Sequence, residues 1–415
     1  MKILAQFERK KLSLIVALGL CSIIVAGCNN FVRSEETMPD LNCQQLKIWT
    51  VAKLQWNHTI RADPVEIGPL PPDLAQVTGR PGPKYYPVRS YIEETFANPA
   101  GLGLMVAWGN GQTMPVAILV GETTKVIQLT KPPQILSVRS DGGVWTNYPL
   151  SHYDSTGTIK KVLEVSGTDL IGVEGDAVWV MDFNEAWFVS SSGDVRGPYP
   201  WKGFNSSVGS GVALCTLEGD GVRRVQCLEP DGKKRFVAPL LPQNPEGKLL
   251  AFSDNWLLTG DEVGGALSYY NSAGVAANLN IENAGITSTG EAFVSFRKDN
   301  KWADVCLSNG ISRRFSIQYN TPSIDLPFRL SVAAVEGSRT LVYGFDRAVW
   351  YEGSRIENSF TVDDNVYRKD IFPHHWRTAT HFVTAKSSDG TIIISTSGPT
   401  GMAIIGMRWH PESQG

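Results

Sequence analysis

Three histidines and several carboxylates lie close together near the C-terminus. The histidines are His374, His375 and His381, and the nearby carboxylates are Asp363, Asp364 and Asp370. Neutral imidazole nitrogens bind zinc, copper and iron, so this grouping would suit a transition-metal site. However, adjacent histidines on a strand point to opposite faces, and no His-x-x-x-His spacing is present. We therefore predict a solvated loop here, with no metal and no other cofactor.

Two further groups could do chemistry on carbohydrate. Asp182 and Glu185 flank a predicted tight turn and could act as paired carboxylates, although an acidic pair on a surface turn is far commoner. The segment Arg139-Ser140-Asp141-Gly142-Gly143-Val144-Trp145 resembles the Asp-box turn of sialidase-like propellers, but it is one residue short and lacks the opening Ser. A sialidase would also need an arginine cluster and a Tyr nucleophile with an acidic partner, and neither stands out.

Motifs of other enzyme classes are also missing from the sequence. It contains no Gly-x-Ser-x-Gly elbow, no phosphate-binding loop and no His-Glu-x-x-His pair. We predict that the protein is not an enzyme, and we assign no catalytic residue. A periplasmic glycan-processing enzyme is kept as the alternative from another functional class.

The N-terminus carries the most specific signal in the chain. Four basic residues and one acidic residue precede an apolar run of 16 residues from Leu12 to Gly27, which is shorter than the roughly 20 residues that span a bilayer. The run ends in Val25-Ala26-Gly27-Cys28. This ending resembles the lipobox of bacterial lipoproteins, in which a thiolate accepts the lipid and small residues enter the peptidase cleft.

The lipobox resemblance implies a lipid-anchored protein. In that family the signal, here residues 1–27, is removed, and Cys28 carries a diacylglyceryl group and an acylated α-amine. Several acyl chains make such attachment effectively permanent. Asn29 follows the cysteine, whereas in enteric bacteria Asp there resembles an inner-membrane retention signal, so we expect an outer-membrane protein that faces the periplasm. Exposure on the cell surface is the alternative orientation. Residues 28–46 are expected to be a tether.

The four other cysteines of the mature chain could form disulfides, because an exported protein enters an oxidising compartment. Cys215 and Cys227 are equally distant from Gly221 at the centre of a predicted turn, so they should face each other across a hairpin and form a disulfide. Buried free thiols are the alternative. Cys43 with Cys306 is a further pairing that no spacing in the sequence indicates. A zinc site is not indicated, since no ligand-spaced partners are present.

Composition and charge exclude several functional classes. The 415 residues include 42% hydrophobic and 19% charged residues, which excludes disorder as the main state. The net charge is -3, and removal of residues 1–27 leaves 34 basic and 40 acidic residues. A nucleic-acid binder would show a basic stripe, so none is predicted. A polybasic membrane-binding surface is also not indicated, and membrane attachment should rest on the lipid alone.

A repeating β unit occupies most of the chain. Residues 47–100 hold one predicted strand, Lys47 to Leu54, and a proline-rich segment whose only short helical candidate is Ile92 to Phe96. From residue 101 to 415 a unit of short strands and tight turns recurs. A glycine in the second turn of each unit marks eight copies, spaced 36 to 45 residues apart: Gly121, Gly157, Gly193, Gly232, Gly274, Gly310, Gly353 and Gly398.

Four short strands per roughly 40 residues predict an all-β fold, a β-propeller of about eight four-stranded blades. Each blade exposes two apolar faces that only neighbouring blades can bury, so the array should close into a ring. The strand Lys47 to Leu54 could supply the missing edge of the last blade. A seven-bladed ring and a two-domain β-sandwich protein are the alternatives.

A lipoprotein with eight predicted blades resembles the propeller subunit of the outer-membrane barrel assembly machinery. That family usually carries an Ala-x-Asp-x-x-Thr-Gly-x-x-x-Trp pattern, and no full copy is present here. The Trp-Asp ending of WD40 repeats is also missing. The resemblance therefore implies an architecture and a location, and it identifies no partner.

The twelve tryptophans lie mostly within predicted strands, where packing between blades explains them. Trp201 and Trp376 fall in longer loops and are the candidates for a binding surface, since exposed aromatic residues anchor interfaces. We predict a lipid-anchored envelope propeller that binds another protein as a scaffold or assembly factor. An immunity-type lipoprotein that blocks an envelope-targeted toxin is the alternative among binding proteins.

Overall fold

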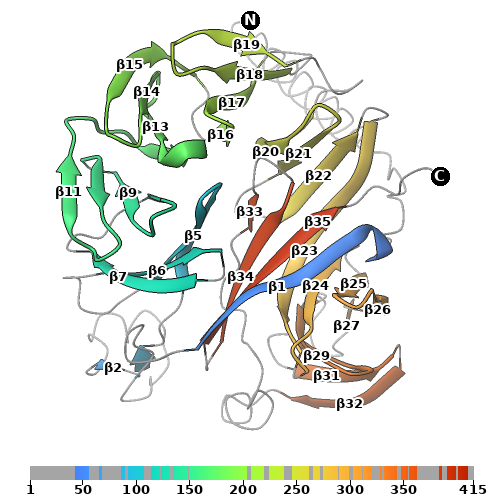
Figure 1. The fold of residues 1–415 in the computed structure, drawn as a ribbon. Coiled ribbons are helices and arrows are strands. Elements are labelled where there is room, and N and C mark those ends of the chain that lie inside the picture. The colour runs from blue at the N-terminus through green and yellow to red at the C-terminus, as the bar shows by residue number, and fades with distance from the viewer. Residues whose placement is uncertain are drawn as a thin grey trace, which may run out of the picture. The chain divides into compact units, whose positions relative to one another are not determined.

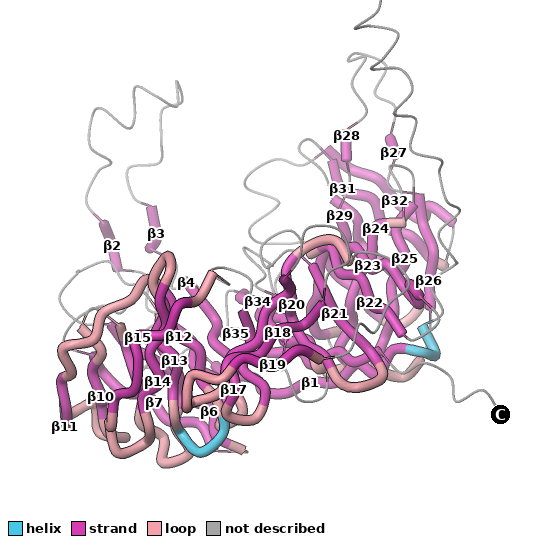
Figure 2. Tube along the Cα trace, turned by 90° about the horizontal axis from the view of Figure 1, so that it is seen from above, coloured by secondary structure: helices cyan, strands magenta, loops and turns pink. Residues whose placement is uncertain are grey.

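The computed structural model describes residues 43–55, 65–67, 86–88 and most of 92–409, where the longer gaps are 107–113, 238–244, 320–327 and 362–382. The described residues are mainly strands with turns and loops between them. Their two helices are single 3-10 turns, η1 (Cys43–Gln45) and η2 (Glu174–Asp176) (Figure 2). Neither helix is long and apolar enough to cross a membrane.

The strands form consecutive four-stranded antiparallel units, which we call blades and number along the chain (Figure 1). The first blade comprises β4 (Ile92–Asn98), β5 (Gly101–Val106), β6 (Met114–Val120) and β7 (Thr123–Leu129). The second comprises β8 (Leu136–Val138), β9 (Val144–Thr146), β10 (Ser151–Tyr153) and β11 (Ile159–Val162). The third comprises β12 (Asp169–Gly172), β13 (Val178–Met181), β14 (Glu185–Val189) and β15 (Val195–Pro200). The fourth comprises β16 (Ser207–Ser210), β17 (Ala213–Glu218), β18 (Arg224–Leu228) and β19 (Lys234–Phe236).

The remaining strands complete the pattern with one shared strand. The fifth blade comprises β20 (Lys248–Phe252), β21 (Trp256–Gly260), β22 (Ala266–Asn271) and the first half of β23 (Gly274–Ile286). The sixth comprises the second half of β23 with β24 (Ala292–Arg297), β25 (Trp302–Leu307) and β26 (Ser312–Ser316). The seventh comprises β29 (Ser331–Glu336), β30 (Arg339–Tyr343), β31 (Arg347–Glu352) and β32 (Arg355–Thr361). Two short pairs are separate: β2 (Val65–Ile67) with β3 (Tyr86–Val88), and β27 (Gln318–Tyr319) with β28 (Phe328–Arg329).

The eighth blade joins the two ends of the chain. It comprises β33 (Val383–Ala385), β34 (Ile392–Gly398), β35 (Gly401–Trp409) and, as its outermost strand, β1 (Leu46–Gln55). β1 pairs with β35 in antiparallel register from Leu46 opposite Trp409 to Gln55 opposite Gly401. The predicted N-terminal edge strand is therefore present, and the described residues form an all-β propeller of about eight blades, two of which share strand β23 in one seven-stranded sheet.

The structure corrects the expected start of the repeat. Ile92 to Phe96, the short helical candidate, belongs to strand β4 and pairs with β5, with Ile92 opposite Val106. The first blade therefore begins before residue 101. A five-residue segment with apolar residues only at its two ends does not distinguish a helix from a strand, and pairing with the neighbouring strand decides the conformation.

Buried apolar side chains fill the spaces between neighbouring blades. One cluster joins Ile118 and Leu129 of the first blade to Leu136 of the second. Further clusters lie between the second and third, third and fourth, fourth and fifth, and sixth and seventh blades. The largest cluster combines residues of the fifth, sixth and eighth blades with β1. The repeat was expected to be stabilised mainly by burial of apolar side chains between neighbouring blades, and these clusters provide it.

Contacts between first strands show how the blades follow one another. β4 contacts β8, β8 contacts β12, β12 contacts β16, and β16 contacts β20. In the eighth blade β33 contacts both β4 and β20, so the fifth and eighth blades also touch each other. The sixth blade contacts β1 through β24 and the seventh blade through β23 and β29.

Candidate functional site

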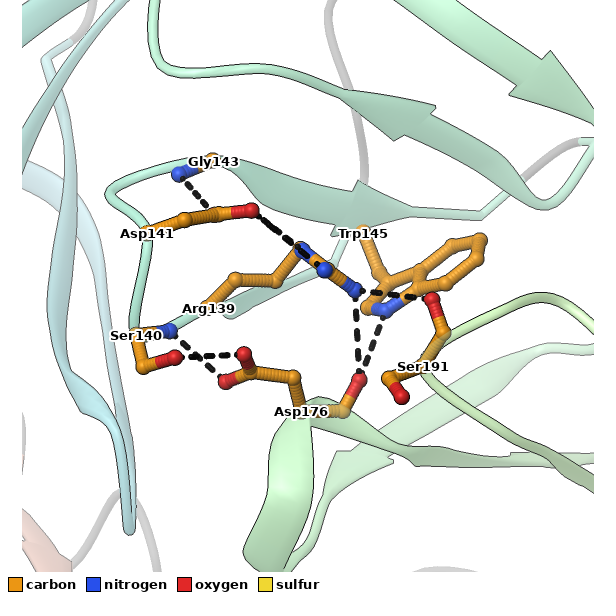
Figure 3. A network of polar contacts seen from close by, with 7 residues as sticks. All are labelled: Arg139, Ser140, Asp141, Gly143, Trp145, Asp176 and Ser191. Atoms are coloured by element: carbon orange, nitrogen blue, oxygen red, sulfur yellow. Dashed lines mark hydrogen bonds and ion pairs between the residues drawn. The ribbon is translucent and has the colours of Figure 1, made fainter.

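Polar residues of the second and third blades form a network at one end of these blades (Figure 3). The turn between β8 and β9 supplies Arg139, Ser140, Asp141 and Gly143, β9 supplies Trp145, η2 supplies Asp176, and the turn between β14 and β15 supplies Ser191. Because turns that join the first to the second strand and the third to the fourth lie at the same end of a blade, these segments can meet.

Arg139 is the central cation of this network, and it is only 8% exposed. Its Nε and Nη2 each lie 3.3 Å from Oδ2 of Asp141. Its Nη1 donates to the carbonyl oxygens of Asp176 and Ser191, both at 3.4 Å, so one side chain reaches two turns of the next blade. The guanidinium also lies 5.6 Å from the centroid of the Trp145 ring. These contacts satisfy a buried charge that would otherwise be costly.

Asp176 receives most of the donors from the second blade. Its Oδ1 accepts the Ser140 N–H at 2.7 Å and its Oδ2 accepts the Ser140 hydroxyl at 2.5 Å. Its carbonyl oxygen also accepts the Trp145 indole N–H at 3.0 Å. Asp176 has a φ of 62°, the one positive value for a non-glycine residue in the described part of the chain. These bonds hold a backbone conformation that is unfavourable for a side chain with a Cβ.

The indole contact recurs one blade further along. Trp179, on β13, donates its indole N–H to the carbonyl oxygen of Val212 in the fourth blade at 2.9 Å. Trp145 and Trp179 are 1% and 0% exposed. Both therefore serve packing between blades, as predicted for the tryptophans that lie within strands.

The Asp-box-like segment uses its aspartate within its own turn. Asp141 Oδ1 accepts the Gly143 N–H at 2.8 Å, while Oδ2 faces Arg139. His152 lies beside this segment, with its ring centroid 5.0 Å from that of Trp145. Burial lowers the pKa of His152, and the Arg139 charge lowers it further. These contacts hold the second and third blades together. The hydrogen-bond donors and the carboxylates of the network are used in these contacts.

Both disulfide pairings considered from the sequence are present. Cys215 and Cys227 face each other in β17 and β18, and their Cα atoms are 4.1 Å apart. Cys43 bonds to Cys306 with a Cα separation of 5.4 Å, linking η1, directly before β1, to the sixth blade. Turn symmetry predicts the first pairing, whereas no local pattern in the sequence indicates the second.

The structure corrects one candidate of the binding surface. Trp201 is 1% exposed and packs among Trp179, Leu214 and Leu228, so it does not offer an exposed aromatic ring. The loop after β15 places Trp201 between the third and fourth blades. A loop position flanked by proline or glycine does not indicate this burial. Trp376 and the histidines at 374, 375 and 381 lie outside the described residues. In the described part of the chain no group of three metal-ligating side chains comes together.

The predicted turn at Asp182 and Glu185 is present. The residue at its tip, Phe183, was not among the site residues predicted from the sequence. The Asp182 N–H donates to the Glu185 carbonyl oxygen at 2.9 Å, which closes the β13–β14 hairpin. Phe183, at its tip, is 68% exposed. The signal was available in the sequence, because an aromatic residue inside a two-residue turn has no strand neighbours to bury it.

Comparison with known proteins shows likeness at the level of fold. No protein-family model and no curated protein matches the chain. Among solved structures, virginiamycin B lyase from Staphylococcus aureus is 13% identical, with 87% of this chain and 99% of that chain covered and a TM-score of 0.33. The β-propeller domain of the Trilobed protease from Pyrococcus furiosus is 11% identical, with 66% and 99% covered and a TM-score of 0.37. Acylaminoacyl peptidase from Pyrococcus horikoshii is 11% identical, with 74% and 57% covered and a TM-score of 0.36. Likenesses of this size carry no argument about activity or ligands.

Proposed function

We propose that the protein is a lipid-anchored β-propeller of the bacterial outer membrane that faces the periplasm and binds another envelope protein without catalysis. The lipobox ending at Cys28 supports the anchor. The Cys215–Cys227 and Cys43–Cys306 disulfides are consistent with an oxidising compartment.

The binding role is supported by hydrogen bonds that hold turns of neighbouring blades in fixed positions relative to each other. Arg139 bonds to the backbone of Asp176 and Ser191 in the third blade. The Glu174 N–H in turn donates to the Gly211 carbonyl oxygen of the fourth blade at 2.9 Å. A surface whose loops are already held in place loses little conformational entropy on binding, which favours recognition of a protein partner.

Co-purification tests the binding role. The tagged, lipidated protein is recovered from gently solubilised envelopes, washed with salt, and analysed by mass spectrometry for what stays bound. A second lipoprotein with the same tag is the control. We expect one protein in stoichiometric amount that is missing from the control. Recovery of the propeller alone would contradict the proposal and would make glycan ligands and turnover the next functions to test.

Substitution of the lipidated cysteine tests the anchor. Cys28→Ala removes the thiolate that accepts the lipid, so nearly all of the protein should move from the membrane pellet to the soluble fraction. Cys21→Ala, a matched change within the apolar run, should leave the protein in the pellet. Continued sedimentation of Cys28→Ala with membranes after a high-salt wash would contradict lipid anchoring.

A further inference from the structure

The β13–β14 hairpin projects an aromatic ring out of a buried blade. All four residues of β13 are buried, and Met181 is 0% exposed. Two residues later Phe183 is 68% exposed, the highest value among the large apolar side chains of the described part. Ala186, on the returning strand, is again 0% exposed. The phenyl ring of Phe183 is thus exposed at the tip of the short turn between β13 and β14.

Backbone contacts hold this tip in one conformation. The Asp182 N–H donates to the Glu185 carbonyl oxygen at 2.9 Å, and the Glu185 N–H donates back at 3.4 Å. Asp182 Oδ1 accepts the Phe183 N–H at 2.8 Å. From below, the N–H of the buried Trp201 donates to the Asn184 carbonyl oxygen at 2.8 Å. The turn cannot fold Phe183 back into the core without breaking these bonds.

The chemistry of the tip is aromatic and acidic. Asp182 and Glu185 place a carboxylate on each side of Phe183, and Glu185 is exposed. A single exposed apolar residue is ordinary on a protein surface. A phenyl ring on a hydrogen-bonded turn that also carries two acidic residues has a more specific complement, because interfaces bury aromatic anchors in pockets and match charge of opposite sign around them.

We infer that the hairpin tip Asp182–Glu185 is a docking surface, and that its partner is a protein with an apolar pocket bordered by lysine or arginine. This inference rests on the proposed protein-binding function and adds the surface and the partner's chemistry to it. Phe183 enters the pocket, and the carboxylates of Asp182 and Glu185 face the basic border.

Site-specific photo-crosslinking in intact cells tests the surface. A benzoyl-phenylalanine replaces Phe183 in the full-length, lipidated protein, and a second strain carries it at Phe236, which is 46% exposed on β19 in the fourth blade. We expect one discrete protein adduct from position 183 and none of the same mass from position 236. The cross-linked position in the partner should be an apolar residue in a pocket with lysine or arginine at its border.

Affinity measurements with the partner so identified then test the chemistry. Phe183→Ala should weaken binding by the full-length protein at least tenfold, whereas Phe236→Ala should change it less than twofold. Glu185→Lys should also weaken binding, and its effect should shrink as salt is raised because it acts through charge. Unchanged urea-unfolding midpoints establish that each variant is folded.

Several results would overturn the inference. They are the absence of an adduct at position 183, equal adducts at both positions, or an adduct with lipid, glycan or a second copy of this chain. A stoichiometric partner from co-purification whose affinity ignores Phe183→Ala would overturn the docking surface while leaving the proposed function intact. Failure of both experiments would remove the binding role itself.

Discussion

His152 is the described histidine whose surroundings oppose its charged form. Its Nε2 atom is buried and has no hydrogen-bond partner, and its ring lies against Trp145. Burial lowers its pKa below the ordinary 6.5, and the positive charge of Arg139 acts in the same direction. The carboxylates of Asp141, Asp154 and Asp176 raise this pKa, but their combined effect is the smaller one.

The protein should therefore lose stability as the pH falls below about 6.5. Above that pH His152 is neutral in both the folded and the unfolded chain, so it adds no pH dependence. Below it the unfolded chain binds a proton more readily, and the free energy of unfolding decreases. Urea unfolding at pH 7 and pH 5 should show a smaller decrease for His152→Asn than for the unsubstituted protein. Equal decreases would show that His152 does not titrate in this way.

Glycine and tryptophan show what can be predicted at this scale. Seven of the eight marker glycines have a positive φ, from 59° at Gly121 to 116° at Gly274. Gly398 instead ends β34 opposite Gly401. Tight turns need this backbone conformation, and glycine adopts it without strain, so the signal is local. The burial of Trp201 depends on Leu214 and Leu228 of the next blade, and no local pattern shows that contact.

At the scale of elements, the two disulfides differ in how much chain they enclose. Cys215 and Cys227 are 12 residues apart in sequence, and they join strands that already pair with each other. Cys43 and Cys306 are 263 residues apart, and they join η1, directly before β1, to β25. The short pairing could be derived from turn symmetry, whereas the long one depends on the packing of whole blades.

Loss of the long disulfide should destabilise the protein more than loss of the short one. Chain entropy in the unfolded state predicts about 5–6 kcal/mol for a loop of 263 residues and about 3 kcal/mol for a loop of 12. The paired variants Cys43→Ser with Cys306→Ser and Cys215→Ser with Cys227→Ser serve as matched controls for each other in urea unfolding. A larger loss for the 215–227 pair would contradict this order.

The shared strand β23 is an element that the repeat pattern did not reveal. The sequence marks Gly274 and Gly310 as turns of two separate units, and 36 residues separate them. In the structure one strand of 13 residues serves both blades, pairing with β22 through Asn280 and with β24 from Ile281. A continuous strand and two strands joined by a tight turn share the same alternation of side chains, so register with the neighbours decides between them.

At the scale of the whole molecule, β1 completes the eighth blade from the opposite end of the chain. Leu46 and Ile48 are 6% and 4% exposed, and both pack with residues of β35. Trp49 lies directly against Gly406, where a Cβ would come within 2.4 Å of the indole. Without β1, strand β35 would present an unpaired edge, a template for aggregation. The predicted Lys47 to Leu54 strand could be recognised because β-branched and aromatic residues dominate it and no helical spacing is present.

Removal of β1 should therefore destabilise the entire propeller rather than one blade. We compare two chains, residues 41–415 and residues 56–415. Both carry Cys306→Ser, and the longer chain also carries Cys43→Ser, so neither can form the Cys43–Cys306 disulfide. The two chains then differ only in β1 and its flanking residues. The longer chain should unfold cooperatively. The shorter chain should lose roughly 3–6 kcal/mol from the burial of Leu46 and Ile48 alone, and more from the unpaired backbone of β35. We expect it to aggregate or to unfold at a much lower urea concentration. Equal midpoints with equal near-ultraviolet circular dichroism would mean that β1 only covers the eighth blade, and that contacts of β33 with β4 and β20 close the fold without it.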